Sequence, residues 1–268
     1  MSRTIGFIGC GNIAKSMIAG IVKSKKVNSN QIIASNRSTP SLVEMEELYG
    51  IKTTTSNLEV AQNADFLFLT ITADSYEAVI SEIREVVRPS TIIVSVAAGE
   101  SIQKNEQRFG RPVKLIKAMP NTPAMVNEGV TGLAVNEHVT ESDKEEIKAI
   151  FESFGRVELV DESLMDVVTA VGGSSPAFTY MFIEALADGA VMYGMPRKQA
   201  YVFAAQAVLG AAKMMLETNI HPAELKDSVC SPGGTTIESV ARLEERGLRS
   251  AVIEAVKVNV EKAKQIHG

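Results

Sequence analysis

The sequence predicts an α/β fold in two domains, a parallel sheet with its helices first and an all-α domain after it. Three observations lead to this fold class. Short β-rich apolar runs alternate with helical patterns in the first part of the chain. A glycine-rich turn follows the first of these runs, and no convincing strand follows Asp161.

The expected strands are short apolar runs rich in β-branched residues, and each is bounded by Gly, Pro, Asn or Ser. A charged helix is expected from Ser142 to Phe154, with Asp143, Glu145 and Glu146 in its first turn, where the helix dipole favours acids. The predicted strands are Thr4–Ile8, Gln31–Ala34, Phe66–Thr70, Thr91–Val96, Val113–Ala118, Thr131–Val135 and Arg156–Val160.

Helical patterns run from Asp161 to the end of the chain, so we place the domain boundary there, with domains at residues 1–161 and 162–268. Prolines 176, 196 and 222 stand where a first helical turn tolerates a missing N–H. The expected helices are Leu164–Val171, Pro176–Tyr193, Pro196–Glu217, Pro222–Ser228, Gly233–Arg246 and Leu248–Gln265.

Two of these helices, Pro176–Tyr193 and Pro196–Glu217, are apolar on nearly all sides. A helix of that kind must be surrounded by other apolar groups. A domain of this size has little interior for two such helices, so we expect a second copy of the chain to cover them in an intertwined homodimer. A monomeric bundle is the alternative.

Composition narrows the class of protein. The chain of 268 residues has a formal net charge of −5, which argues against a nucleic-acid binder. Its two cysteines, Cys10 and Cys230, form no CxxC pattern, so neither a disulfide framework nor a metal site is expected and a reducing cytoplasm fits best. No signal peptide is visible at Met1, and the apolar stretch from Ala177 to Met195 carries two acids, which argues against a membrane span.

The segment from Ile5 to Ala14 indicates a dinucleotide site, because a strand there leads directly into G-x-G-x-x-A and a helix. Gly9 allows the tight turn, Gly11 lets the backbone approach a pyrophosphate, and Ala14 lets the helix pack closely on the strand. The helix N-terminus offers free N–H groups to the phosphates. A purely structural glycine-rich turn is the alternative.

The end of the second strand indicates which dinucleotide binds. A carboxylate there would hold the ribose hydroxyl of NAD, but this chain has Ser35, Asn36, Arg37 and Ser38. Hydroxyls, an amide and a guanidinium suit a 2′-phosphate, so the sequence favours NADPH, with NADH as a weaker substitute. A solvated loop is the alternative.

A second glycine-rich loop, from Ser231 to Thr236, precedes an amphipathic helix. Consecutive glycines let backbone N–H groups converge on an anion, and the helix dipole adds to this. With no arginine nearby, the loop suits a single carboxylate better than a polyphosphate, although a simple N-cap is the alternative. From the residues alone, the chain is a two-domain NADP-dependent oxidoreductase for a small carboxylate.

The whole chain resembles the pyrroline-5-carboxylate reductases, which make proline. The resemblance implies a Rossmann domain, a C-terminal helical dimerisation domain and a homodimer or a ring of dimers. SPGGTTI is its most specific element. The segments that carry it, in order, are GFIGCGNIA, SNRS, SVAAGESI, AMPNTPA, GGSSPAF, EALADGAV, HPAELKD and SPGGTTI.

The resemblance also implies roles for individual residues. Ser231, Gly234, Thr235 and Thr236 would hold the substrate's carboxylate and ring nitrogen. The residues implied to line the cofactor site are Ile8, Gly9, Cys10, Gly11, Asn12, Ile13, Asn36, Arg37, Asn57, Thr70, Ile71, Thr72, Ala73, Val96, Ala97 and Ala98.

The chain departs from the family where a Lys-Pro pair usually follows the third Rossmann strand, since it has Thr72, Ala73 and Asp74. This exchange of a positive charge for an acid is the support for one rival, a non-catalytic paralogue that binds the nucleotide as a regulator. Another rival is a β-hydroxyacid dehydrogenase, which needs a lysine on the long central helix, and Ala177 to Met195 contains none.

Thr236 is the predicted catalytic residue. Hydride transfer to a cyclic imine requires the nitrogen to be protonated or hydrogen-bonded, and a neutral hydroxyl can orient a preformed iminium. None of the three histidines, His138, His221 and His267, falls in a motif. We also expect thiol alkylation at Cys10 or Cys230 to inactivate the enzyme, with two inert buried thiols as the alternative.

Overall fold

The computed structural model describes residues 3–267, which form two compact units. The first unit runs to Gly173 and also takes up the segment that begins at Asn259; the second unit is Ser174–Val258. Among the described residues no helix is long and apolar enough to cross a bilayer.

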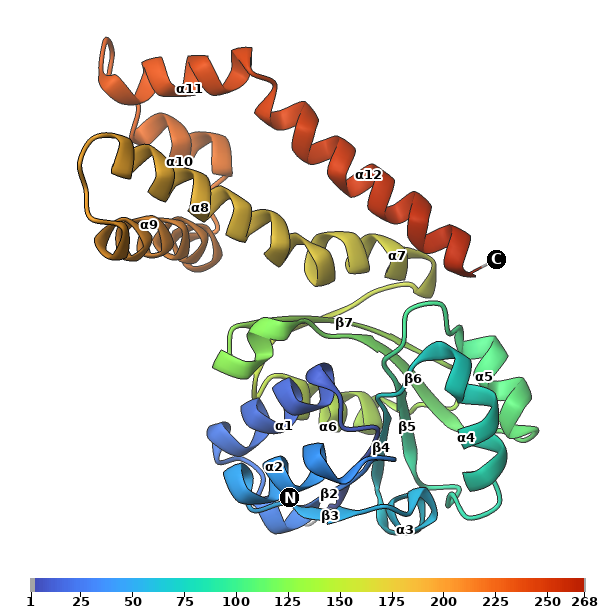
Figure 1. Cartoon of the computed structure of the whole chain (residues 1–268). Coiled ribbons are helices and arrows are strands. Elements are labelled where there is room, and N and C mark those ends of the chain that lie inside the picture. The colour runs from blue at the N-terminus through green and yellow to red at the C-terminus, as the bar shows by residue number, and fades with distance from the viewer. Residues whose placement is uncertain (1–2, 268) are drawn as a thin grey trace. The chain divides into compact units, whose positions relative to one another are not determined.

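The first unit is built on one sheet with the strand order β3-β2-β1-β4-β5-β6-β7-β8 (Figure 1). All neighbours pair in parallel except β6 and β7. The strands are β1 Ile5–Ile8, β2 Ile32–Ser35, β3 Lys52–Thr54, β4 Phe66–Leu69, β5 Ile92–Ser95, β6 Lys114–Met119, β7 Gly129–Val135 and β8 Gly155–Leu159.

Helices cover both faces of this sheet and bury a separate apolar core on each side (Figure 1). One core contains residues of α1 Asn12–Ser24, α2 Thr39–Tyr49 and α6 Glu141–Phe151. The other contains residues of α3 Asn57–Asn63, α4 Tyr76–Ile83 and α5 Ile102–Phe109. Strand residues alternate between the two cores, so each central strand is apolar on both faces, as parallel sheets require.

The strand order reverses at β1. The chain proceeds from β1 to β2 and β3 on one side, and then β4 pairs with the other side of β1. In open α/β sheets the crevice at such a switch point, outside the carboxyl ends of the strands, is where ligands bind. The fold therefore places the candidate site at the ends of β1, β2 and β4.

The expected α/β class is confirmed, and all seven predicted strands are present within a few residues. Strand β3 was missed, because Lys52–Thr54 is a short and partly exposed edge strand without an apolar run. The expected parallel sheet is present except at β7, which is antiparallel to β6. The link between them holds only the short helix η3 Thr122–Val126, and a parallel return needs a longer crossover.

The second unit is helical among its described residues, and its helices begin close to where the proline positions predict. They are α8 Ser175–Met192, α9 Arg197–Thr218, α10 Pro222–Ser228, α11 Thr235–Glu245 and α12 Leu248–His267, the last of which continues into the first unit. The helix expected at Leu164–Val171 is instead a single α-turn, α7 Met165–Val168, followed by the π-helix Thr169–Ser174.

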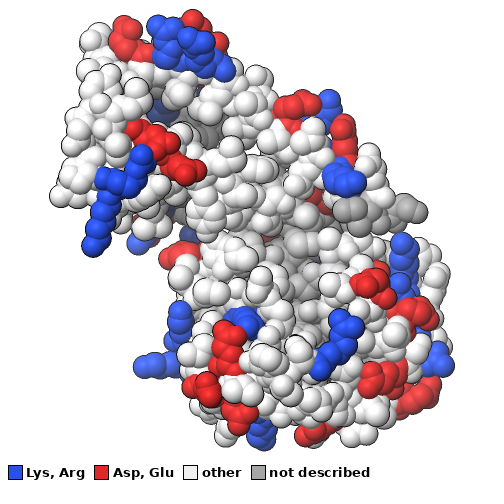
Figure 2. Space-filling view, in the orientation of Figure 1, with Lys and Arg blue, Asp and Glu red and all other residues white. Residues whose placement is uncertain are grey.

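Helices α8 and α9 pack against each other through small side chains, and the only buried apolar residues of the second unit are Ala187, Ala200 and Ala204. Large apolar side chains around them remain exposed: Tyr180 at 62%, Met181 at 69% and Phe203 at 65%. Figure 2 shows wide uncharged areas over this unit, whereas acidic and basic side chains are interspersed over the drawn face of the first unit.

Candidate active site

A cavity of about 570 Å³ lies in the first unit, outside the carboxyl ends of β1, β2 and β4. Ten of the predicted cofactor residues line it, together with five residues between Asp74 and Glu82. The lining residues are Ile8, Gly9, Cys10, Gly11, Asn36, Arg37, Asn57, Thr70, Ile71, Thr72, Asp74, Ser75, Ala78, Val79 and Glu82.

The turn after β1 is fixed against the end of β4. Gly9 has a φ of +96°, and a Cβ there would lie 2.6 Å from the carbonyl oxygen of Thr70. The Thr70 hydroxyl donates to the carbonyl oxygens of Gly9, at 2.6 Å, and Ile8, at 3.1 Å. Only glycine fits this turn, and the contact aligns the two strand ends on either side of the switch point.

Glycine suits position 11 for a different reason. A Cβ at this position would meet no atom within 4 Å, and the backbone φ of −83° is one that any residue adopts. Gly11 is also the N-cap of α1, and no side chain caps that helix end. An open approach to uncapped N–H groups fits the pyrophosphate of a dinucleotide.

The loop after β2 is ordered by Asn36. Its Oδ1 accepts the N–H of Cys10 at 3.3 Å, and its Nδ2 donates to the carbonyl and hydroxyl oxygens of Ser38. Arg37 beside it is exposed, lines the cavity, and makes no ion pair among the described residues. A free guanidinium with a neighbouring hydroxyl fits a phosphate on the ribose.

One wall of the cavity is a chain of hydrogen bonds. The Ser35 hydroxyl donates to Oδ1 of Asn57 at 2.8 Å, and Nδ2 of Asn57 donates to the Glu82 carboxylate at 2.9 Å. Ser35 ends β2, Asn57 begins α3 and Glu82 belongs to α4, so these hydrogen bonds join three elements. It fixes the orientation of the Asn57 amide at the cavity.

The sequence reasoning missed the cavity residues Ala78, Val79 and Glu82 of α4 and its N-cap Ser75, whereas Asp74 before them was noted as a departure. Ser75, Ala78, Val79 and Glu82 stand at i, i+3, i+4 and i+7, which is one face of a helix. This spacing could have identified them once one member was placed.

Six of the predicted cofactor residues do not line the cavity. Asn12, Ile13 and Ala73 neighbour residues that do, while Val96, Ala97 and Ala98 follow β5 directly at its carboxyl end. Because β5 pairs with β4, this segment lies beside the end of β4, where Thr70 to Thr72 line the cavity.

The predicted substrate residues form the loop Ser231–Thr236 in the second unit, called the carboxylate loop below. The N–H of Gly234 donates to the carbonyl oxygen of Ser231 at 3.0 Å, which closes a turn. Gly233 in this turn has a φ of +67°, which favours glycine, and a Cβ on Gly234 would lie 2.5 Å from Oγ of Ser231, which would have to move aside. Gly234 is the N-cap of α11, and no side chain caps that helix end.

Thr236 lies in the first turn of α11 and is half-buried. Its hydroxyl has no hydrogen-bond partner among the described residues, and it does not cap the helix. The two uses that the sequence left open for this hydroxyl were a ligand contact and a helix cap. The geometry leaves the hydroxyl available to a ligand.

Neither cysteine forms a disulfide among the described residues, and the two thiols differ in their exposure to solvent. Cys10 is buried, and this burial raises the pKa of its thiol to about 11, whereas Cys230 is partly exposed. For Cys10 the structure favours the inert thiol over the reactive one.

The histidines stay outside the two candidate sites as far as they are described. His138 lines a shallow surface hollow with Glu137, and the His221 ring caps α10 by accepting the N–H of Ala223. The His267 side chain lies outside the described part of the chain. No group of His, Cys, Asp and Glu residues within that part could hold a metal ion.

Two family models match the chain, one in each part. Residues 162–266 match the family described as pyrroline-5-carboxylate reductase dimerisation. Residues 4–99 match the family described as NADP oxidoreductase coenzyme F420-dependent, and that range contains the cavity described above.

Whole proteins match over their full length as well. The chain is 46% identical to the pyrroline-5-carboxylate reductase of Escherichia coli over 99% of both chains. It superposes on the pyrroline-5-carboxylate reductase of Coxiella burnetii with a TM-score of 0.92 and 33% identity, covering 100% of both. A Plasmodium falciparum pyrroline carboxylate reductase with NADP bound gives a TM-score of 0.89 at 28% identity, covering 99% of this chain and 98% of that one.

Proposed function

This chain belongs to the pyrroline-5-carboxylate reductase family, and from that premise we propose how its residues share the work of the reaction. The chain is an NADP-dependent oxidoreductase that reduces 1-pyrroline-5-carboxylate to L-proline, the last step of proline biosynthesis. The full-length match to curated reductases carries this conclusion and sets aside the β-hydroxyacid dehydrogenase, while NADPH oxidation by the purified chain distinguishes the enzyme from a non-catalytic paralogue.

The cofactor is NADPH, and we assign it to the cavity at the ends of β1, β2 and β4. The open approach at Gly11 and the uncapped end of α1 would hold the pyrophosphate, and Arg37 would hold the 2′-phosphate. When bound, NADPH supplies the hydride. NADH is a weaker substitute because it has no phosphate for Arg37 to grip.

The substrate is assigned to the carboxylate loop. The N–H groups at the uncapped start of α11 converge on the carboxylate, and the helix dipole stabilises its negative charge. In 1-pyrroline-5-carboxylate the ring nitrogen is bonded to the carbon that bears the carboxylate. A loop that holds the carboxylate therefore brings the Thr236 hydroxyl within reach of the nitrogen.

Thr236 acts by orientation. Its hydroxyl oxygen accepts the N–H of the iminium and so fixes which face of the C=N bond receives the hydride. As the imine carbon gains the hydride, the nitrogen gains the electron pair of the double bond and keeps the proton of the iminium. The product is the ring amine of proline, and no further acid is needed.

A pair of substrates tests the carboxylate loop. The purified chain should oxidise NADPH with 1-pyrroline-5-carboxylate, and 1-pyrroline, which has the same ring without the carboxylate, should show a roughly 10- to 150-fold lower kcat/KM. Losing one charge-assisted contact costs about 1.5–3 kcal/mol. Equal kcat/KM values for the two imines would disprove the assignment of the loop.

We further propose that the chain works as a homodimer, and a ring of such dimers stays a prediction. The apolar residues left uncovered on α8 and α9 support this, as does the dimerisation family matched by residues 162–266. That match begins one residue after Asp161, which supports our domain division at 1–161 and 162–268, although the first compact unit reaches Gly173. We also propose that the protein works in a reducing cytoplasm, which two cysteines without a disulfide support.

A further inference from the structure

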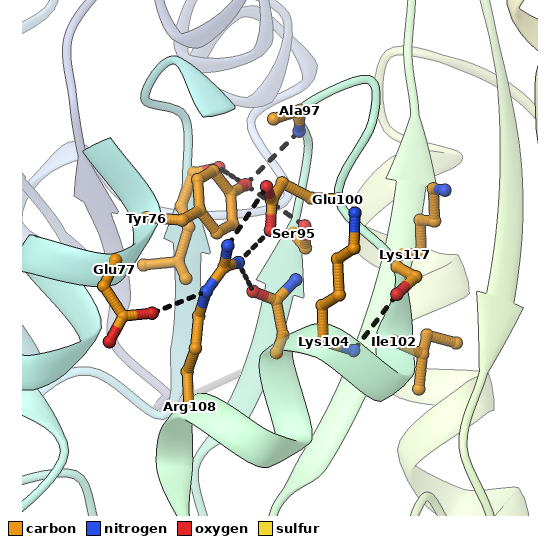
Figure 3. Close-up of polar contacts among 12 residues, drawn as sticks. Tyr76, Glu77, Ser95, Ala97, Glu100, Ile102, Lys104, Arg108 and Lys117 are labelled. Carbon is orange, nitrogen blue, oxygen red and sulfur yellow. Dashed lines mark hydrogen bonds and ion pairs between the residues drawn. The ribbon is translucent and has the colours of Figure 1, made fainter. Parts of the chain in front are cut away.

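A buried tyrosine joins the two strand ends beside the cofactor cavity. Tyr76 is the first residue of α4 and has an exposure of 0%. Its hydroxyl donates to the carbonyl oxygen of Leu69 at 2.8 Å. The Tyr76 hydroxyl oxygen also accepts the Ser95 hydroxyl at 3.1 Å and the N–H groups of Val96 at 3.2 Å and Ala97 at 3.3 Å (Figure 3).

These partners stand where the ladder between β4 and β5 stops. The register pairs Phe66 with Ile92 and ends at Leu69 opposite Ser95. Beyond that pair the two chains continue as Thr70–Ala73 and Val96–Ala98, the segments assigned to the cofactor. One backbone bond, from the N–H of Val96 to the carbonyl oxygen of Leu69 at 3.3 Å, still joins the two chains there, and the Tyr76 hydroxyl adds a side-chain link beside it.

The segment after β5 is also held at its other end. Arg108 lies over the Tyr76 ring, 6.0 Å from its centroid, and pairs with the buried carboxylate of Glu100 (Figure 3). Arg108 also contacts Glu77 at 3.1 Å and Oδ1 of Asn105 at 2.9 Å. The segment is therefore held by Tyr76 at Val96 and Ala97 and by Arg108 at Glu100.

The hydroxyl keeps its proton under working conditions. Burial raises the pKa of Tyr76 above its ordinary value, even though hydrogen bonds from Ser95, Ala97 and Val96 act in the opposite direction. A protonated hydroxyl is required for the bond to the Leu69 carbonyl. The same oxygen can then donate to one strand end and accept from the other.

We propose that Tyr76 is a positioning residue for the cofactor: through one hydroxyl it holds Val96 and Ala97 in register with Thr70–Ala73, so that both segments face the dinucleotide together. This inference rests on the cofactor site proposed above. Tyr76 itself does not line the cavity and acts through the backbone of residues beside it.

The same two strands provide a matched control at their opposite ends. The hydroxyl of Thr91, just before β5, is buried and donates to the carbonyl oxygen of Ala64, just before β4, at 3.1 Å. Thr91→Val and Tyr76→Phe each remove one buried hydroxyl that links β4 to β5. Only Tyr76 does so at the carboxyl ends, where dinucleotides bind.

Titration calorimetry with NADPH, alongside thermal unfolding of the chain without nucleotide, tests the proposal. Tyr76→Phe should raise the Kd for NADPH about tenfold, which corresponds to ~1.4 kcal/mol of binding free energy. Thr91→Val should leave the Kd within about twofold of wild type, while both variants lower the unfolding temperature of the free chain. If Tyr76→Phe does not fold, Ser95→Ala should raise the Kd by a smaller factor of about three, because it removes one of the four contacts.

A wild-type Kd in Tyr76→Phe, or an equal rise in Thr91→Val, would overturn the proposal. If Ser95→Ala has to replace Tyr76→Phe, an unchanged Kd for NADPH in Ser95→Ala would overturn the proposal. Arg37→Ala, measured in the same way, separates this inference from the site on which it rests. If NADPH binding is weaker in Arg37→Ala but unchanged in Tyr76→Phe, only the role of Tyr76 is rejected. If the Kd for NADPH is unchanged in both variants, the cofactor site is rejected as well.

Discussion

Arg37 lies beside the cavity and has no ion-pair partner among residues 3–267, while Lys15 on the neighbouring helix α1 pairs with Glu44. Its neighbour Asn36 is fully used in holding the loop, by accepting from Cys10 and donating to Ser38. The two adjacent residues therefore have different tasks. Asn36 shapes the loop, and Arg37 is available to the phosphate that distinguishes NADPH from NADH.

Arg37→Ala should raise the KM for NADPH and change that for NADH little. Loss of one exposed charge-assisted contact costs on the order of 1–2 kcal/mol, or roughly 5- to 30-fold in KM. Steady-state kinetics with each cofactor would measure this. Arg84→Ala at the other end of α4, where Arg84 pairs only with the exposed Glu85, is the control. Equal effects of Arg37→Ala on both cofactors would contradict the assignment.

Thr236 has a free hydroxyl at the start of α11, so its removal should not weaken the helix cap. We expect Thr236→Ala to lower kcat roughly 10- to 100-fold with a smaller rise in the KM for substrate, because the hydroxyl, which accepts the N–H of the iminium, orients the C=N bond for hydride transfer. Thr236→Ser keeps the hydroxyl and should stay largely active. The measurement is kcat across pH at saturating NADPH, and wild-type turnover in Thr236→Ala would remove the residue from the mechanism.

At the scale of single elements, helix α6 shows how a local sequence signal is reinforced by packing. Thr140 and Asp143 form a capping box, in which the Asp143 carboxylate accepts the Thr140 N–H at 2.9 Å and the Asp143 N–H donates to the Thr140 hydroxyl at 3.2 Å. Lys114 of β6 reaches the same carboxylate at 2.7 Å. The cap therefore also joins the helix to the sheet.

The pKa of Asp143 reflects opposing effects. Burial by itself would raise it, but Lys114 and Thr140 together hold it below the ordinary value of 3.8. A carboxylate with a lowered folded-state pKa contributes stability that is fully present above its unfolded-state pKa. That contribution is lost as pH falls from about 3.8 through the lower folded-state value.

Asp143→Asn should reduce the free energy of unfolding by about 1–2 kcal/mol at pH 7, because it removes the charge that Lys114 and the helix end require. The gap to wild type should narrow below pH 4, where the native carboxylate becomes protonated. Urea unfolding at several pH values would measure both. Glu141→Gln, in the same turn but exposed, should cost less than about 0.5 kcal/mol. A gap that stays constant down to pH 2 would refute the linkage.

At the scale of the whole molecule, the two units bury apolar surface in different ways. The first unit has two cores of large side chains, one on each face of the sheet. The second unit buries only three alanines by itself and leaves Met181 and Phe203 uncovered. Exposed apolar area of this kind indicates an interface, and the match to a dimerisation family indicates a second copy of the chain as its occupant.

Combined Met181→Asp and Phe203→Asp substitutions should convert the proposed dimer to monomers, because each would bury a charge at the proposed interface. Analytical ultracentrifugation would measure the mass at micromolar concentration. Val43→Asp on α2 of the first unit, where Val43 is 49% exposed, is the control and should leave the mass unchanged. If the doubly substituted chain keeps the wild-type mass, these helices are not the interface.

The sequence by itself determined the elements and the chemistry that depends on short segments. The alternation of strands and helices, the turn at Gly9 and the run Ser231–Thr236 are local, because each follows from a few consecutive residues and their backbone preferences. Resemblance along the whole chain then gave the reaction. Where the local signal was weak, as at the exposed edge strand Lys52–Thr54, the prediction failed.

Only the tertiary structure decided which distant residues meet. The antiparallel pairing of β7 depends on the length of the link before it, and the α4 face that lines the cavity depends on how that helix packs against the sheet. Burial is the main cause of the raised thiol pKa of Cys10, and the packing of α4 against β4 and β5 brings the Tyr76 hydroxyl to its four polar partners. The physical reason is that pKa, hydrogen bonding and solvent access are set by neighbours in space, which are tens of residues away along the chain.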